Sequence, residues 1–375
     1  MTTNREESEM MRKLLCIVGG MNAGGAETFL MKIYRKLDRN EFQIDFAVAV
    51  DGVYDEEIKK LGGNIYKITS KSNNIWKNFF DIIYIVKKYK YKSVLRVSQN
   101  SFSAFELLAA KIGGAKILAF RSSNSSTVEG NKKEIIIHKM CKWMPALFAN
   151  IRFAPSTEAA EYMFGKGCIE SNKAFLLKNG IDINEYHYDE QARQRIRKEL
   201  ELNNAFVVGH IGRFNQQKNH LFLLEVFSKI KECNENALLV LCGTGEKEKE
   251  IKKLVYKMNL EKSVIFAGVR LDIPQVLSAM DVLIFPSLYE GMPNAIIEAQ
   301  ATGLPCVISD HITKEVKVTD IVKFMPLENP EEWAKVSIMA KGSGSLPREL
   351  YAREIIEHGY SIEDSGTLFC QKCFF

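Results

Sequence analysis

The sequence predicts an α/β protein with two Rossmann-like domains, each built around its own parallel sheet. The chain has 375 residues, which is more than one hydrophobic core usually organises. Short apolar runs alternate with amphipathic segments, a pattern typical of parallel strands joined by right-handed helical crossovers. This alternation stops near residue 180 and restarts near residue 205, so we expect two sheets rather than one.

The first domain is predicted over residues 1–185. A short strand, Lys13–Val18, leads into a glycine-rich segment at 19–27 and then into an amphipathic helix that runs to about Leu37. Further segments follow the same order, each strand being bounded by a glycine or a polar turn. We expect strands at 42–50, 64–68, 93–98, 115–120 and 174–178, and helices at 55–63, 75–92 and 102–114.

The second domain is predicted over residues 186–348. A charged helix at 189–202 connects it to the first, and strands and helices then alternate up to about residue 345. The last part, 349–375, contains a charged helical segment that the sequence alone does not assign to either domain. We expect strands at 206–214, 237–245, 263–269, 281–287 and 305–310, helices at Asn219–Lys231, Pro274–Ala279 and Asn294–Thr302, and a Lys/Glu-rich helix after the strand at 237–245.

The segment Ser287–Pro305 carries the strongest functional signal. A strand runs into a loop that ends at Gly291, Met292 and Pro293, and a helix begins at Asn294. Proline suits the first turn of a helix and glycine allows a ligand to approach the backbone closely. The N–H groups and the dipole at such a helix start favour a phosphate.

Two glutamates frame this helix start. Glu290 precedes the helix and Glu298 lies eight positions later, about two helical turns away. This spacing does not suit a pair of carboxylates flanking one glycosidic bond, so a glycosidase is not favoured. It suits two acids that bind hydroxyls on different sugars of one long ligand. Solvated surface acids are the alternative for either residue taken alone.

A basic pair, Arg213 and Lys218, follows the first strand of the second domain. Two cations between a strand end and a helix start can neutralise a leaving diphosphate. Gly243 and Gly245 end the next strand, and such a glycine pair is weak evidence by itself. Two surface cations and a simple turn are the alternative interpretations.

Together these motifs resemble the retaining family-4 GT-B glycosyltransferases. The likeness rests on Glu-(seven residues)-Glu, preceded by P-S-x-x-E-G and followed by A-x-x-x-G-x-P, and it covers about residues 12–345. It implies a GT-B fold, with two parallel-sheet domains facing across a cleft, and retaining transfer from a nucleoside-diphosphate sugar. It also implies that Glu298 holds the donor ribose, and that Glu290 with Gly291–Asn294 holds the donor sugar and diphosphate.

The resemblance extends to further residues. It implies nucleotide contacts from Gly243, Gly245 and Arg270, and a contact of Gly24 and Gly25 with the donor phosphate from the first domain. The stretch Arg121, Ser123 and Asn124 resembles an acceptor-side segment of capsular and exopolysaccharide enzymes. Ser123 stands where histidine is common, so a residue that would orient the transferred sugar is absent.

The distribution of charge along the chain indicates which binding partners to expect. Residues 71–150 contain 14 basic and 4 acidic residues. This region is either a solvated basic face or a surface that meets anionic lipid or a phosphate-bearing substrate. We expect a glycan or polyprenyl-diphosphate-linked acceptor and peripheral contact with an anionic membrane. Nucleic acid is not expected, because no recognised binding module accompanies the charge.

No cofactor or metal is expected, the substrate being a UDP- or GDP-linked sugar. The 8 cysteines are scattered, and Cys370 and Cys373 lack two further zinc ligands nearby. We find neither a secretory signal nor a spanning segment, so we expect a cytoplasmic protein at the inner membrane face. Two alternatives stay open: a nucleotide-sugar epimerase of the same two-domain fold, and a catalytically weak nucleotide-sugar-binding partner.

Overall fold

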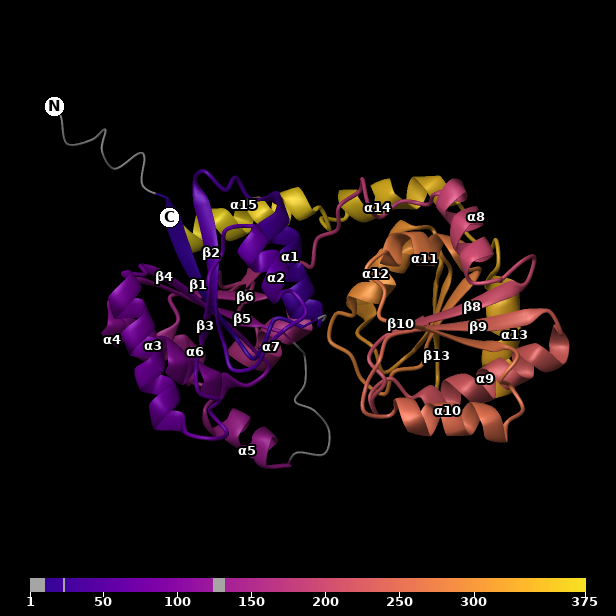
Figure 1. Ribbon diagram of the computed structural model, residues 1–375, viewed down its shortest axis with the longest axis horizontal. Coiled ribbons are helices and arrows are strands. Elements are labelled where there is room, and N and C mark those ends of the chain that lie inside the picture. The colour runs from indigo at the N-terminus through magenta and orange to yellow at the C-terminus, as the bar shows by residue number, and fades with distance from the viewer. Residues whose placement is uncertain (1–10, 23, 124–131) are drawn as a thin grey trace. The chain divides into compact units, whose positions relative to one another are not determined.

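The computed structural model describes residues 11–22, 24–123 and 132–375 (Figure 1). The chain divides into two compact units, which we treat separately. Unit 1 comprises the chain up to Gly180 together with Ile362–Phe375, and unit 2 comprises Ile181–Ser361. The sequence placed this boundary at residue 185.

Unit 1 contains a seven-stranded parallel sheet in the order β3-β2-β1-β4-β5-β6-β7. The chain moves outward from β1 to β3, then crosses to the other side of β1 and continues from β4 to β7. The order therefore reverses between β1 and β4, where α/β proteins of this kind bind ligands. The strands are β1 (Arg12–Val18), β2 (Phe42–Val48), β3 (Ile65–Lys67), β4 (Ser93–Ser98), β5 (Ile117–Ser122), β6 (Ile151–Ala154) and β7 (Phe175–Leu176).

Helices cover both faces of this sheet. Apolar side chains of α1, α2 and α15 form one core layer, and those of α3, α4 and α6 form the other. Helix α15 lies beside α1 (Figure 1). The helices are α1 (Gly25–Lys36), α2 (Asp55–Lys60), α3 (Ile75–Tyr89), α4 (Phe105–Gly113), α5 (Lys132–Met140), α6 (Met144–Phe148), α7 (Thr157–Phe164) and α15 (Ile362–Cys373), with a 3-10 turn at Ser101–Ala104.

Unit 2 contains a six-stranded parallel sheet in the order β10-β9-β8-β11-β12-β13. The order reverses between β8 and β11, as it does between β1 and β4 in unit 1. The prediction of two parallel sheets is confirmed. The strands are β8 (Phe206–Ile211), β9 (Ala237–Cys242), β10 (Val264–Gly268), β11 (Val282–Phe285), β12 (Cys306–Ser309) and β13 (Val322–Met325).

Two helical layers cover the sheet of unit 2. Helices α9, α10 and α13 pack on one face, and α8, α11, α12 and α14 pack on the other. The helices are α8 (Glu190–Glu199), α9 (His220–Cys233), α10 (Glu248–Lys257), α11 (Ile273–Ala279), α12 (Asn294–Ala301), α13 (Pro330–Ala340) and α14 (Tyr351–Glu357), with 3-10 turns at Lys314–Val316 and Arg348–Leu350.

The last part of the chain, which the sequence left unassigned, belongs to both units. Helix α14 packs against α12 in unit 2, and Arg348 donates hydrogen bonds to the carbonyls of Thr302 and Met280. Helix α15 packs in unit 1, where the Ser365 hydroxyl donates to the carbonyl of Lys178. Among the described residues, no helix combines the length and apolar character needed to cross a bilayer.

Candidate functional site

The candidate donor site lies at the carboxyl ends of β8 and β11 in unit 2. These strands are neighbours in the sheet, with Val208 paired to Val282 and Gly209 to Leu283. The loop after β8 carries Arg213 and Lys218, and the loop after β11 carries Glu290. Because parallel strands end at the same edge, the sheet itself brings these loops together.

Lys218 and Glu290 form an ion pair across the two loops. The Lys218 ammonium lies 2.6 Å from Glu290 Oε1, and the side chains are 14% and 12% exposed. The ammonium also lies 4.2 Å from the centre of the Phe285 ring, a cation–π contact. The pair is thus partly shielded from water, which strengthens its electrostatic interaction relative to a surface pair.

Backbone contacts fix the two loops against each other. The Leu288 N–H donates to the Gln217 carbonyl at 2.8 Å, and the Gln217 side-chain amide donates to the Tyr289 carbonyl at 2.8 Å. Glu290 also forms a bridge with Ile312, in the loop after β12. The ion pair therefore rests on a defined backbone framework.

A buried pair of histidines lies close enough to Lys218 for its charge to affect them. His210 on β8 and His220 at the start of α9 have ring centres 4.9 Å apart, and the Nδ1–H of His210 donates to the Ile284 carbonyl at 2.9 Å. His210 Nε2 and both ring nitrogens of His220 are buried without a hydrogen-bond partner among the described residues. Burial lowers the pKa of His220 to about 4, with a smaller effect of Lys218, and places that of His210 well below its ordinary value. Both rings are neutral at pH 7, so the positive charge here resides on Lys218.

Arg213 is held much less firmly. Its guanidinium lies 3.2 Å from Glu246 Oε2, but the two side chains are 72% and 58% exposed. An exposed pair of this kind contributes about 0–1 kcal/mol. The Arg213 side chain can therefore leave Glu246 for an anion at little cost.

The start of α12 follows Glu290 directly. Pro293 occupies the N-cap position, so the helix start at Asn294 receives no capping side chain from it. Gly291 and Met292 are buried, and the Tyr360 hydroxyl lies 3.7 Å from the Met292 sulfur. Glu298 is buried within α12. A carboxylate is thus enclosed about one turn behind a helix start that can accept an anion.

Gly243 and Gly245 allow two loops to pack backbone against backbone. A Cβ on Gly243 would lie 2.0 Å from the Gly212 carbonyl oxygen, and one on Gly245 would lie 2.4 Å from the Phe214 carbonyl oxygen. Gly243 also has a φ of +141°, which side chains rarely adopt. These contacts account for both glycines without a ligand.

Arg270 is engaged by two carboxylates. Its guanidinium bonds Asp272 at 2.7 and 2.5 Å and Glu199 of α8 at 2.5 Å. The hydrogen bonds that Arg270 donates to Asp272 and Glu199 raise the pKa of Arg270. The Arg270 side chain thus has a structural partnership within unit 2, and a base-binding role must come from its backbone or require the release of these bonds.

Gly24 and Gly25 lie at the start of α1 in unit 1. Gly24 is the N-cap of α1, and a Cβ there would lie 2.4 Å from a carboxylate oxygen of Glu27. Burial raises the pKa of Glu27, while Arg121 and Arg96 oppose the shift. The glycine loop therefore leaves room for a carboxylate beside the helix start.

Of the predicted acceptor-side residues, Arg121 is buried in unit 1 and donates to Asn179 Oδ1. Its guanidinium also stacks over the Phe29 ring at 4.3 Å, and burial lowers the pKa of Arg121 to about 9. Ser123 follows β5, and its N–H donates to the Ser98 carbonyl at 3.2 Å. Asn124 lies outside the described residues. Arg121 thus acts within the core, and Ser123 is held by main-chain contacts at the carboxyl edge.

The comparisons with known proteins define the family. EpsF of Bacillus subtilis (strain 168), whose name assigns it provisionally as a glycosyltransferase, is 31% identical over 361 residues, which are 94% of each chain. Residues 205–338 match the family described as glycosyl transferases group 1. The chain belongs to the group 1 glycosyl transferases. The resemblance found in the sequence is confirmed, and this glycosyltransferase carries its family match on the unit that holds Lys218 and Glu290.

One further relative and one solved structure are similar to this group 1 glycosyl transferase. The UDP-Gal:alpha-D-GlcNAc-diphosphoundecaprenol alpha-1,3-galactosyltransferase of Escherichia coli is 29% identical over 62% of each chain. The crystal structure of HepE of Anabaena in complex with UDP-glucose superposes with a TM-score of 0.78 at 19% identity, covering 96% of this chain and 98% of that one. The structural likeness confirms the GT-B type of fold, with two Rossmann-like units. The epimerase alternative receives no support.

The sequence did not predict His210 and His220 as part of this site. His210 lies two positions before the motif G-R-F-(three residues)-K-N at 212–219, and His220 directly follows it. The sequence indicates these histidines only by their positions. One stands in an otherwise apolar strand, Phe206–Ile211, and the other is the first residue of the next helix. Only the folded structure brings the two rings together.

Proposed function

We propose that this glycosyltransferase moves a hexose from a UDP- or GDP-linked sugar to a polysaccharide or polyprenyl-diphosphate-linked acceptor, with retention of anomeric configuration. The observation that carries the proposal is the shielded Lys218–Glu290 ion pair, which lies at the reversal point of the sheet beside the start of α12. Strand-order reversal points are where doubly wound sheets bind nucleotides.

In the proposed reaction, the bond between the anomeric carbon and the diphosphate oxygen breaks, and the nucleoside diphosphate leaves with the bonding electron pair. The acceptor hydroxyl oxygen forms the new bond to the same carbon, and its proton passes to the leaving diphosphate. Negative charge grows on the leaving diphosphate, so preorganised cations accelerate the step. Lys218 and the loosely held Arg213 supply these cations, and N–H groups at the start of α12 supply further donors.

Glu290 and Glu298 have different proposed tasks. Glu290 orients the Lys218 ammonium and binds a hydroxyl of the donor sugar. Glu298, enclosed in α12, accepts hydrogen bonds from the ribose hydroxyls of the nucleotide. Main-chain groups of Gly291, Met292 and Asn294 contact the diphosphate. The proposed reaction requires neither a metal ion nor another cofactor.

The relatives motivate the choice of acceptor. The Escherichia coli galactosyltransferase is named for a sugar linked to diphosphoundecaprenol, and a relative from Staphylococcus aureus, 26% identical over 86% of this chain, is named for capsular polysaccharide biosynthesis. A lipid-linked acceptor also agrees with the basic balance of residues 71–150. The weak-binding-partner alternative predicts no turnover with any such acceptor.

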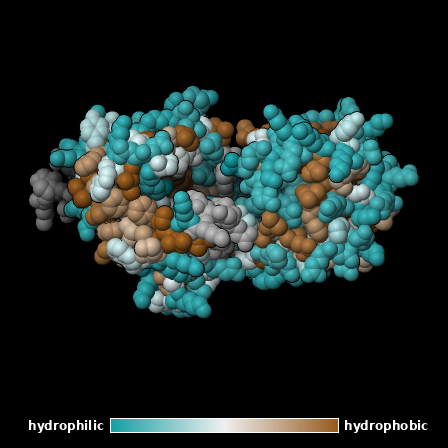
Figure 2. Space-filling model, turned by 90° about the horizontal axis from the view of Figure 1, so that it is seen from below, coloured by the Kyte–Doolittle hydropathy of each residue, from teal (hydrophilic) through white to brown (hydrophobic). Residues whose placement is uncertain are grey.

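We also propose peripheral contact with an anionic membrane through unit 1. The outward face of α3 exposes Trp76, Phe80 and Tyr84, each more than half exposed, and Lys87 and Lys88 follow on the same helix. Aromatic side chains beside lysines suit the boundary between lipid headgroups and acyl chains. Brown and tan surface on the unit 1 side of Figure 2 shows apolar residues reaching solvent.

The experiment that tests the proposed function starts from the nucleotide. The full chain is screened by thermal shift against UDP, GDP and their common sugar conjugates. The donor that raises the Tm most is then supplied with polyprenyl-diphosphate-linked sugars, and transfer is followed by release of the nucleoside diphosphate. We expect product with the anomeric configuration of the donor. The protein could instead bind the donor while neither transfer to an acceptor nor donor hydrolysis exceeds background. That result would support the binding-partner alternative.

A further inference from the structure

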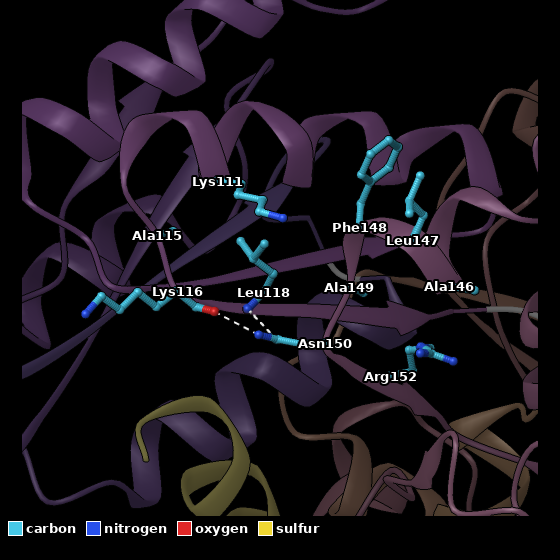
Figure 3. Close-up of a pocket in the computed structure, with 10 residues that line it drawn as sticks. All are labelled: Lys111, Ala115, Lys116, Leu118, Ala146, Leu147, Phe148, Ala149, Asn150 and Arg152. Atoms are coloured by element: carbon cyan, nitrogen blue, oxygen red, sulfur yellow. Dashed lines mark hydrogen bonds between the residues drawn. The ribbon is translucent and has the colours of Figure 1, made fainter.

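Side-chain amides fasten separate backbone segments to each other in both units. In unit 1, the Asn150 amide donates to the Lys116 carbonyl and accepts from the Leu118 N–H, both at 2.8 Å (Figure 3). In unit 2, Gln300 on α12 makes a larger clamp of the same kind, and its side chain is fully buried. The backbone that Gln300 holds is the β12–β13 segment, residues 310–321, which joins these two strands.

The Gln300 amide uses both its nitrogen and its oxygen to hold the β12–β13 segment. Nε2 donates to the Val316 carbonyl at 2.8 Å, and to the Ile296 carbonyl of its own helix at 3.1 Å. Oε1 accepts from the N–H groups of Val318 and Thr319 at 3.0 and 2.9 Å, and from the Thr319 hydroxyl at 3.0 Å. Five hydrogen bonds therefore converge on one buried side chain, and four of them join α12 to the segment.

The β12–β13 segment also pairs with Glu290. Ile312 and Glu290 form a parallel bridge. One 3-10 turn, Lys314–Val316, separates this bridge from the clamp, and the Thr313 hydroxyl accepts from the Glu315 N–H at the start of the turn. The clamp thus acts on the Glu290 backbone through a short stretch that is itself hydrogen-bonded.

The loop that carries Glu290 is supported by two different segments. The Leu288 N–H donates to the Gln217 carbonyl in the loop after β8, whereas the Leu288 carbonyl accepts from His311 Nδ1–H of the β12–β13 segment at 3.2 Å. Glu290 in turn contacts the Lys218 ammonium at 2.6 Å. Functional side chains act best when they are held to within about 0.5 Å of their working positions, so the support of this loop matters for the pair.

We infer that Gln300 is a positioning residue for sugar transfer. Through the β12–β13 segment it sets the place of the Glu290 carboxylate, and with it that of the Lys218 ammonium. The inference deepens the proposed function and rests on it, because an effect on turnover requires the role proposed for Glu290. Its structural part, the coupling of residues 316–319 to residues 288–291, concerns the protein without substrate and can be measured there.

Three variants separate positioning from a general loss of stability. Gln300→Met keeps the length of the side chain and removes all its hydrogen bonds. Thr319→Val is a milder variant on the segment side, because it removes one bond to Gln300 Oε1 and keeps the shape. Thr302→Val is the matched control: Thr302 is also fully buried on this stretch of chain, but its hydroxyl donates to the Ala299 carbonyl within α12. Each change removes a buried hydrogen bond and should lower the Tm, but only the first two should reach Glu290.

Hydrogen–deuterium exchange of the full-length proteins without ligand measures the structural coupling. In Gln300→Met we expect exchange at least about fivefold faster in peptides covering 316–319 and also in those covering 288–291, the factor that the net loss of one hydrogen bond represents. Thr319→Val should show a smaller change at both places, and Thr302→Val should show none. Faster exchange at 316–319 with unchanged exchange at 288–291 would overturn the inference.

A double-mutant cycle with Glu290→Gln measures the effect on sugar transfer, at a temperature well below the lowest Tm. We expect Gln300→Met to lower kcat roughly 10-fold in the wild-type background, because displaced catalytic groups lose much of their effect. In the Glu290→Gln background its further effect should be less than about twofold, since coupled positions are not additive. An equal effect in both backgrounds would overturn the positioning role. Absence of transfer by the wild type would contradict the proposed function instead, and the exchange result would still decide the coupling.

Discussion

At the scale of single residues, the proposed site of unit 2 depends on a lysine whose charge is held in place by two contacts. Glu290 contacts the Lys218 ammonium at 2.6 Å, and the centre of the Phe285 ring lies 4.2 Å away. A cation fixed before the reaction needs little reorganisation when charge develops on a leaving group. This makes Lys218 the residue whose loss should affect turnover most.

We therefore expect Lys218→Ala to lower kcat by roughly 100-fold while changing donor affinity much less, because leaving-group charge is greatest in the transition state. Steady-state kinetics of nucleoside diphosphate release measure both quantities. Lys229→Ala is the control, since Lys229 is an α9 lysine in an exposed pair with Glu232. A Lys218→Ala enzyme within threefold of the wild type in kcat would exclude the proposed role.

Glu298 is proposed to bind the ribose, so its loss should affect ligand binding rather than kcat. Hydrogen bonds to a charged acceptor contribute about 1.5–3 kcal/mol, so the wild type should prefer a nucleoside diphosphate over its 2′,3′-dideoxy analogue by roughly 10- to 150-fold. In Glu298→Gln this preference should shrink, which isothermal titration calorimetry with both ligands can measure. An unchanged preference in a folded Glu298→Gln protein would move the ribose contact to another residue.

At the scale of elements, the sequence predicted most strands and helices because their apolar periodicity is strong. Strand Lys13–Val18 and the α9 helix appear within a residue or two of the predicted bounds. Strands β6 and β13 were missed, since Ile151–Ala154 and Val322–Met325 have only four residues each and include a charged side chain. Short strands of this kind are specified by the neighbours that they pair with, which the local sequence does not contain.

The site also has one part that the local sequence predicts and one part that depends on which strands are neighbours. The loop-and-helix motif around Glu290 could be predicted, because strand, loop and helix start are consecutive in the chain. The ion pair with Lys218, 72 positions away, could not, because it depends on β8 and β11 being neighbours. Arg270 shows the same limit. The resemblance implied a base contact for it, whereas its partner Glu199, 71 positions away, is brought to it by the packing of α8.

The buried histidine pair makes folding depend on pH. The unfolded chain binds a proton at His220 near the ordinary pKa of 6.5, whereas the folded chain binds it only at about pH 4, chiefly because the ring is buried. The free energy of unfolding should therefore fall as the pH drops from about 6.5 to 4, on the order of 3 kcal/mol from this residue, and should not change from this cause at higher pH.

Urea denaturation of the wild type and His220→Phe at several pH values measures this dependence. The variant keeps an aromatic ring but cannot titrate, so its stability should fall less between pH 6.5 and 4. His358→Phe is the matched control, because His358 is exposed on the surface of unit 2. If His220→Phe and the control showed the same pH dependence as the wild type, the buried ring would not be responsible.

At the scale of the whole molecule, the basic surface and the residues of the proposed donor site belong to different units. The basic residues 87–92 and the exposed aromatic face of α3 belong to unit 1, whereas Lys218, Glu290 and Glu298 belong to unit 2. The proposal therefore assigns membrane contact to one unit and donor binding to the other. The two properties should respond to different mutations.

Charge reversal tests this separation. Lys87→Glu combined with Lys88→Glu should reduce sedimentation with phosphatidylglycerol vesicles, since each exposed basic residue contributes about 1 kcal/mol near an anionic surface, and added salt should have the same effect on the wild type. Nucleoside diphosphate binding should be unchanged. Lys59→Glu with Lys60→Glu on α2, which packs in the other helical layer of unit 1, is the control. Equal loss of vesicle binding in both double variants would contradict a localised surface.

The most direct test of the central claim, that unit 2 binds the donor at the carboxyl ends of β8 and β11, is hydrogen–deuterium exchange of the full chain with and without a saturating nucleoside diphosphate. We expect slower exchange in peptides that cover residues 212–219 and 288–298, because ligand contacts and the fixed loops would protect their N–H groups. Peptides from α3 and from β5 and β6 should be unaffected. Protection confined to unit 1, or absent from both loops of unit 2 at saturation, would contradict the account.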